Sequence, residues 1–179
     1  MNANRIVITG GPGTGKSSVI NELRNRNYTC YEEVSRQVTL DAQKKGIEQL
    51  FLTKPLLFSE LILKAREEHF QKAKQDNKQP VFYDRGLPDV LAYMDYIKSN
   101  YPKNFEEVCE YNRYNKVYIL PPWEAIYVSD NERYENFSQA LNIHEHLVKT
   151  YQRFNYELIS VPFGDVSERT DFILKNLLP

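Results

Sequence analysis

Nine consecutive residues near the start of the chain, GGPGTGKSS, have the types and spacing that suit the binding of phosphate groups. Glycine tolerates positive φ and has no side chain, so successive backbone N–H groups in such a loop can converge on phosphate oxygens. Lys16 adds a cation that can reach β- and γ-phosphates, and the Ser17 hydroxyl can bind a Mg²⁺ ion that bridges them. We expect this loop to hold the polyphosphate of a nucleoside triphosphate, ATP or GTP.

The loop matches the motif G-x-x-x-x-G-K-[ST], which is informative only between a strand and a helix. The strand-like run RIVITG precedes it, and a helix that begins near Lys16 would add its partial positive charge. A glycine-rich turn without a ligand is the alternative, but four fixed positions in this context favour a nucleotide site. We therefore expect the nucleotide to contact the residues Gly10, Gly11, Pro12, Gly13, Thr14, Gly15, Lys16, Ser17 and Ser18.

Charged side chains follow two further strand-like runs. CYEEVSRQ supplies Glu32, Glu33 and Arg36, and VFYDRGLPD supplies Asp84, Arg85 and Asp89. The carboxyl ends of parallel strands meet at one edge of a sheet, so both groups should lie beside the glycine loop. Phosphoryl transfer to a hydroxyl needs a carboxylate, cations for the migrating group and exclusion of water.

These residue types suggest separate roles. With Lys16, we expect Glu33, Asp84 and Arg85 to be catalytic, and Asp84 to join Ser17 as a Mg²⁺ ligand, directly or through water. The residues expected to bind substrate at these strand ends are Glu32, Arg36 and Asp89. A solvated strand end, with Arg36 as a helical ion-pair partner of the two glutamates, is the competing interpretation.

A long connection, PPWEAIYVSDNERYENF over residues 121–137, follows the fourth strand-like run and predicts a lid. Arg133 is its candidate catalytic cation, although one charge in an exposed loop is the simpler explanation. Trp123 is a candidate substrate-binding residue, either as a stacking surface for a base or as a hydrophobic anchor of the lid.

Short runs rich in Val, Ile, Tyr or Phe alternate with amphipathic stretches, a pattern typical of an α/β fold with a parallel sheet. We predict five strands, Arg5–Thr9, Thr29–Glu33, Pro80–Asp84, Lys116–Leu120 and Glu157–Val161. Apolar residues at spacings of three and four predict helices around 90–97, 140–154 and 166–177, the last capped by Asp165. Residues 56–75 have apolar positions on more than one stripe and fit a long, buried helix.

The length and composition limit the number of domains and the kinds of partner that we expect. The length of 179 residues fits one domain, and 23 Lys+Arg against 24 Asp+Glu give no overall field that would attract nucleic acid or an anionic membrane. Cys30 and Cys109 have no metal-knuckle spacing, no apolar run is long enough to span a membrane, and the start lacks the pattern of a signal peptide. We expect a cytoplasmic protein with no nucleic-acid partner and no membrane span.

Several classes of nucleotide-binding protein fit poorly. The candidate segments NKQP, NKVY and TKPL lack the Asp of the guanine-reading Asn/Thr-Lys-x-Asp motif, and Arg85 stands where remodelling ATPases usually carry a Glu. In their order along the chain, GGPGTGKS, EEVSR, DRGLPD and the lid arginine resemble the small AAA-type P-loop ATPase and kinase domains related to the nicotinamide riboside kinase domain of NAD-biosynthesis regulators.

This resemblance implies a three-layer P-loop NTPase fold with helices on both faces of a five-stranded parallel sheet in the order 2-3-1-4-5. It also implies an E-x-x-R pair at Glu33 and Arg36, a strand-end pair at Asp84 and Arg85, and a lid arginine at Arg133. The sequence lacks the adenylyltransferase domain of those regulators, so nicotinamide riboside is only one candidate acceptor.

Two functions remain open. The first is a Mg²⁺-dependent kinase that moves the γ-phosphoryl of ATP to a small hydroxylated, nucleoside-like acceptor. The second is a nucleotide-binding regulator that hydrolyses slowly and signals to a protein or lipid partner.

Overall fold

The computed structural model describes residues 4–73, 80–127 and 135–177. Five parallel strands form one sheet in the order β2-β3-β1-β4-β5, which confirms the predicted α/β topology. The strands are β1 Arg5–Gly10, β2 Thr29–Tyr31, β3 Val81–Asp84, β4 Lys116–Leu120 and β5 Leu158–Ser160. The second strand ends at Tyr31, so Glu32 and Glu33 lie in the connection after it rather than in the sheet.

The register brings the chemically important strand ends together. β1 lies between β3 and β4, and Ile8 stands opposite Asp84 on one side and Tyr118 on the other. The loop after β1 and the segment after β3 therefore leave the sheet at the same edge. This is the arrangement that makes the carboxyl edge of a parallel sheet a binding crevice.

Eight α-helices and one short 3₁₀ helix are present in the described residues. They are α1 Lys16–Asn25, α2 Ser35–Lys44, α3 Leu50–Thr53, α4 Pro55–Lys72, α5 Pro88–Tyr96, α6 Asn104–Tyr111, η1 Glu124–Ile126, α7 Phe137–Arg153 and α8 Val166–Lys175. The long helix expected over residues 56–75 is confirmed as α4, whereas α2, α3 and α6 were not among the predicted helices.

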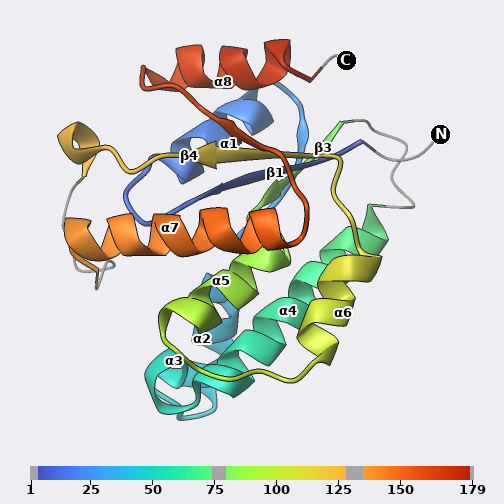
Figure 1. Cartoon of the computed structure of the whole chain (residues 1–179), viewed down its shortest axis with the longest axis vertical. Coiled ribbons are helices and arrows are strands. Elements are labelled where there is room, and N and C mark those ends of the chain that lie inside the picture. Colours follow the sequence, from blue (N-terminus) through green and yellow to red (C-terminus); the bar gives the residue numbers. More distant parts are fainter. Residues whose placement is uncertain (1–3, 74–79, 128–134, 178–179) are drawn as a thin grey trace.

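Helices cover both faces of the sheet. In Figure 1, α1 and α8 lie on one face, and α7 lies on the other with α4 and α5 beyond it. The strands alternate accordingly, because successive side chains point to opposite faces. Ile6 and Ile8 pack with α1 and α8, while Val7 between them joins the cluster on the side of α4, α5 and α7.

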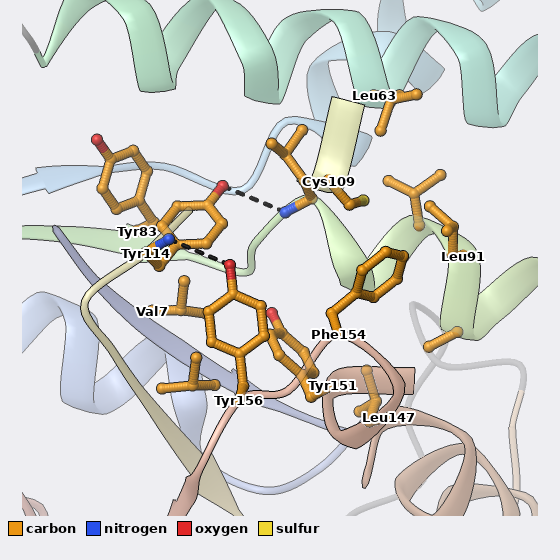
Figure 2. Packing of buried hydrophobic residues seen from close by; sticks show 14 of the residues in the cluster. Val7, Leu63, Tyr83, Leu91, Cys109, Tyr114, Leu147, Tyr151, Phe154 and Tyr156 are labelled. Carbon is orange, nitrogen blue, oxygen red and sulfur yellow. Dashed lines mark hydrogen bonds between the residues drawn. The ribbon is translucent and has the colours of Figure 1, made fainter. Parts of the chain in front are cut away.

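The larger cluster contains tyrosines that also fix loops near the sheet edge. The Tyr114 hydroxyl accepts a hydrogen bond from the Leu87 N–H at 3.2 Å, and the Tyr156 hydroxyl accepts one from the Tyr114 N–H at 3.1 Å (Figure 2). Leu87 belongs to the connection between β3 and α5. The core thereby holds the segment that follows the charged end of β3.

None of the helices in residues 4–73, 80–127 and 135–177 is long and apolar enough to cross a membrane. The expected lid over 121–137 is described only in part, as an extended start, η1 and residues 135–137, where α7 begins. Arg133 lies outside the described residues, so its role in the lid stays a prediction.

Candidate functional site: a phosphate loop beside a cleft

The glycine loop spans the residues between Gly10, which ends β1, and Lys16, which begins α1. Gly13 and Gly15 have φ of 73° and 77°, a region that residues with a Cβ rarely adopt. Gly15 is the N-cap of α1, and no side chain caps this helix. The first N–H groups of α1 therefore remain available, together with its partial positive charge, for an anion in the loop.

Lys16 is buried at the start of α1 and forms an ion pair with Asp84 at the end of β3. Burial lowers the pKa of Lys16, and nearby Arg85 lowers it further, while Asp84 and Glu33 oppose the shift. The pair joins two predicted catalytic residues from segments 68 residues apart. Both lie at the sheet edge where a nucleotide's phosphates are expected.

Ser17 and Asp84 offer a hydroxyl and a carboxylate oxygen near the phosphate loop. In the described part of the chain, no three His, Cys, Asp or Glu side chains group as a metal site. Mg²⁺ is usually held by one or two protein oxygens together with substrate phosphates and water. These two residues fit such an ion, and when bound it would neutralise charge on the phosphates.

Glu33 lies between two arginines, the buried Arg66 and the largely buried Arg85. The Arg66 Nη2 donates to Glu33 Oε1 at 2.8 Å, and the Arg85 Nε lies 2.5 Å from Glu33 Oε2. Burial alone would raise the pKa of Glu33, but Arg66, Arg85 and Lys16 together hold it well below its usual range. Glu33 is therefore a carboxylate at neutral pH, with a fixed orientation.

Arg85 connects this ion network to the phosphate loop. Its Nη1 donates to the Gly10 carbonyl at 2.9 Å and lies 3.3 Å from Asp89 Oδ1. Its φ is 70°, an uncommon conformation for a residue with a long side chain. The surrounding hydrogen bonds impose this strained backbone, which aims the guanidinium at the loop.

Asp89 is fully buried and anchors the segment between β3 and α5. It accepts hydrogen bonds from the Thr9 hydroxyl and the Tyr151 hydroxyl, each at 2.5 Å, and from the Gly86 N–H at 2.9 Å. The Gly86 carbonyl in turn accepts from Arg66 Nη1 at 2.9 Å. The contacts of Asp89 are structural, and direct contact with a substrate stays a prediction.

A cleft of about 800 Å³ opens beside the phosphate loop, between α2, α3, α4, α5 and α7. The side next to the phosphate loop contains Pro12 of the loop and four predicted charged residues, Glu33, Arg36, Arg85 and Asp89. Its other walls are largely apolar and include Leu40, Phe51, Phe58, Ile62, Val90 and Met94. The volume and the mixed lining are those of a small-molecule site.

Two of the predicted substrate-binding residues lie apart from this cleft. Glu32 is 74 % exposed and pairs with Arg24 at 2.8 Å, not with Arg36. The Trp123 ring stacks on Phe163 with centroids 5.0 Å apart. Neither residue is part of the cleft lining, and their binding roles stay predictions.

Two buried arginines near the site were not predicted. Arg66 lies on α4 between Ile62 and Phe70, one turn from each, and Arg169 lies on α8 within the stripe that includes Ile173. A charge on the apolar stripe of a helix was the available signal, because such a charge must find a polar partner inside the fold. The sequence does not show what that partner is.

The sheet order, the Gly-Lys-Ser loop between β1 and α1 and the carboxylate at the end of β3 define a P-loop protein with a kinase-like fold. The sequence matches the family model described as an AAA domain over residues 5–169, so the chain belongs to that family. No curated protein matches the sequence significantly.

Solved structures share the fold at low identity. A deoxyadenosine kinase from M. mycoides has a TM-score of 0.68 and 17 % identity, over 97 % of this chain and 98 % of that chain. A NadR protein in complex with NR has a TM-score of 0.74 and 16 % identity, over 97 % of this chain but 51 % of that one. A thymidylate kinase from Ehrlichia chaffeensis has a TM-score of 0.64 and 14 % identity, over 99 % of each chain.

Proposed function

We propose that this protein is a Mg²⁺-dependent kinase that transfers the γ-phosphoryl group of ATP to a hydroxyl of a small, nucleoside-like acceptor. The observation that carries the proposal is the cleft beside the P-loop, with Glu33 and Arg85 in its wall. A slowly hydrolysing switch needs the phosphate loop. It does not need a separate cleft of ligand size beside that loop at the carboxyl edge of the sheet. Kinases with this fold among the solved structures support the proposal.

The residues divide between donor and acceptor. The loop N–H groups and Lys16 would bind the β- and γ-phosphates, which requires Lys16 to exchange its pairing with Asp84 for contact with phosphate. Ser17 and Asp84 would then hold Mg²⁺. Glu33 faces the cleft whereas Asp84 is not part of its lining, so Glu33 is the better candidate for the acceptor side.

In the reaction, the acceptor oxygen forms a bond to the γ-phosphorus while the bond to the β,γ-bridging oxygen breaks. Glu33 would accept a hydrogen bond from the acceptor hydroxyl and orient it. Because the transition state is loose, the hydroxyl proton would leave late and pass to an oxygen of the transferred phosphoryl group. Arg85 would stabilise charge on the migrating group, and Arg133 is expected to add a second cation. The apolar walls would exclude water and contact the flat part of the acceptor.

The test is acceptor dependence. The purified chain is incubated with Mg²⁺ and γ-labelled ATP or GTP in the presence of nucleosides, nucleoside monophosphates, pyridine ribosides or sugars. We expect saturable transfer of label to one acceptor class, and loss of transfer in Lys16→Ala, whose loop lacks the phosphate-binding ammonium group. Release of inorganic phosphate at the same slow rate with and without every acceptor would contradict the kinase and favour the regulatory hydrolase.

A further inference from the structure

Arg169 reaches the phosphate loop from the other end of the chain. It lies on α8, is only 5 % exposed, and donates through Nη2 to the Thr14 carbonyl oxygen at 2.6 Å. In the described part of the chain, Arg169 forms no ion pair with a carboxylate. A buried guanidinium whose protein contact is one carbonyl of the phosphate loop is unusual, because buried charges are normally paired.

The adjacent Gly15 shows how closely the guanidinium approaches. A Cβ added to Gly15 would lie 2.7 Å from the Arg169 Nη1, well inside contact distance. Gly15 therefore has two reasons to be glycine, its φ of 77° and the space that Arg169 occupies. The side chain packs directly on the peptide unit that joins Thr14 to Gly15.

Peptide geometry gives this contact a consequence. In a trans peptide the C=O and the N–H of one planar unit point in opposite directions. Because Arg169 holds the Thr14 carbonyl on its own side, the Gly15 N–H of the same unit must point away from Arg169. The contact fixes the direction of one of the N–H donors on which an anion-binding loop depends.

The positive charge of Arg169 also favours an anion in the phosphate loop. Burial lowers the pKa of Arg169, and no carboxylate among the described residues offsets that effect. An anion in the adjacent loop would supply the missing opposite charge, and the attraction is stronger in a partly buried site than in water. A diphosphate or triphosphate offers this charge next to the loop.

We infer that Arg169 is a positioning residue of the donor-nucleotide site, which holds the Thr14–Gly15 peptide with its N–H toward the phosphates and contributes positive charge behind the loop. The inference rests on the proposed function only in requiring that the loop binds a nucleotide. It assigns α8 a part in donor affinity that does not depend on the identity of the acceptor.

The experiment measures binding of Mg-ATP and Mg-ADP by calorimetry at several salt concentrations. Arg169→Gln should raise the Kd for both nucleotides about tenfold, as expected for one charge-assisted hydrogen bond, and should reduce the salt dependence of the Kd. The matched control is Arg26→Gln. Arg26 also ties α8 to the rest of the molecule, through Asp171 and Ser167, but at the far end of α1.

We expect Arg26→Gln to keep the wild-type Kd. Wild-type affinity in folded Arg169→Gln, or equal weakening in both variants, would overturn the inference, since the second result would mean that α8 had merely loosened. If circular dichroism shows Arg169→Gln to be unfolded, Arg169→Lys takes its place; it keeps the charge but not the planar geometry, and its Kd should rise about threefold. An unchanged Kd in Arg169→Lys would then overturn the inference.

The binding assay also separates the two proposals. A wild-type protein that binds Mg-ATP but transfers phosphoryl to no acceptor would contradict the kinase. The role of Arg169 would still be decided by the Kd values of the Arg169 variants. A wild-type protein that binds neither nucleotide would overturn both.

Discussion

Glu33 is the residue on which the charge balance of the site depends. It contacts the buried Arg66 and the largely buried Arg85, and its pKa is held well below the usual range because these cations outweigh the effect of burial. Without the carboxylate, the partners of these two guanidinium groups among the described residues would be two backbone carbonyls, Asp89 and the Tyr93 ring. Removing one partner of a buried ion pair is far more costly than removing a surface pair.

Glu33→Gln should therefore lower the free energy of unfolding by about 3 to 5 kcal/mol, measured by urea denaturation at neutral pH. The adjacent Glu32 provides the matched control, because it is 74 % exposed in its pair with Arg24. Glu32→Gln should change the free energy of unfolding by less than about 1 kcal/mol. Equal and small effects in the two variants would show that the buried network contributes no net stability.

The same network predicts a pH dependence. A carboxyl group whose pKa is lower in the folded state stabilises the protein fully above its unfolded pKa, and this contribution is lost as the pH falls through the folded value. The difference in unfolding free energy between wild type and Glu33→Gln should stay constant from pH 7 to about pH 5, then shrink in more acid solution. A difference that grows as the pH falls would mean that Glu33 is protonated in the folded state.

The residues predicted from the sequence are those whose positions follow from local pattern. Lys16 belongs to a motif, and Glu33, Asp84 and Arg85 follow strand-like runs whose ends must meet at one sheet edge. Arg66 and Arg169 could not be placed in the same way, because helix periodicity shows which face is buried but not what lies opposite. Their contacts with the residues after β2 and with the P-loop arise from tertiary packing alone.

At the scale of the element, α8 connects the end of the chain to the P-loop, and its start is fixed by a capping box. Asp165 accepts a hydrogen bond from the Glu168 N–H at 2.8 Å, and the Glu168 side chain accepts one from the Asp165 N–H at 2.9 Å. The predicted cap at Asp165 is thus confirmed, and it fixes the start of α8 one turn before Arg169. Such a cap satisfies backbone donors that the helix itself leaves unpaired.

Asp165→Ala should lower the free energy of unfolding by about 1 kcal/mol, because the Glu168 N–H loses its acceptor. Asp165→Asn retains a side-chain oxygen and should lose at most about half of that amount. Thermal and urea unfolding of the two variants measures the difference. If alanine and asparagine destabilise equally, the negative charge of Asp165 rather than its hydrogen bond stabilises the helix start.

The elements themselves followed from the sequence to different degrees. The five strands were predicted because β-branched and aromatic residues cluster in short runs, and β4 has the predicted bounds Lys116–Leu120. By contrast, α3 and α6 have only four and eight residues, too few for a helical period to stand out from a loop. The apolar wall that α3 adds to the cleft, including Phe51, was for this reason not predicted.

At the scale of the whole molecule, the site combines segments from almost the full length of the chain. The P-loop follows the central strand, Glu33 follows an outer strand, Arg66 comes from α4, and Arg169 comes from the last helix. Cores on both faces of the sheet position these segments. A site assembled in this way exists only when the sheet and its covering helices are all in place.

Binding of Mg-ATP should for this reason stabilise the entire fold rather than one loop. A ligand that binds only the folded state at a hundred times its Kd adds about 2.7 kcal/mol to the free energy of unfolding. For a chain of this size, that corresponds to a rise in Tm of roughly 5 to 10 °C. Differential scanning calorimetry should show a single transition that moves upward as Mg-ATP is added, with a smaller shift when EDTA removes the Mg²⁺.

Lys16→Ala should give little or no shift, because it lacks the ammonium group that would bind the phosphates. A wild-type Tm that does not move at millimolar Mg-ATP or Mg-GTP would contradict nucleotide binding by the P-loop, and with it the kinase.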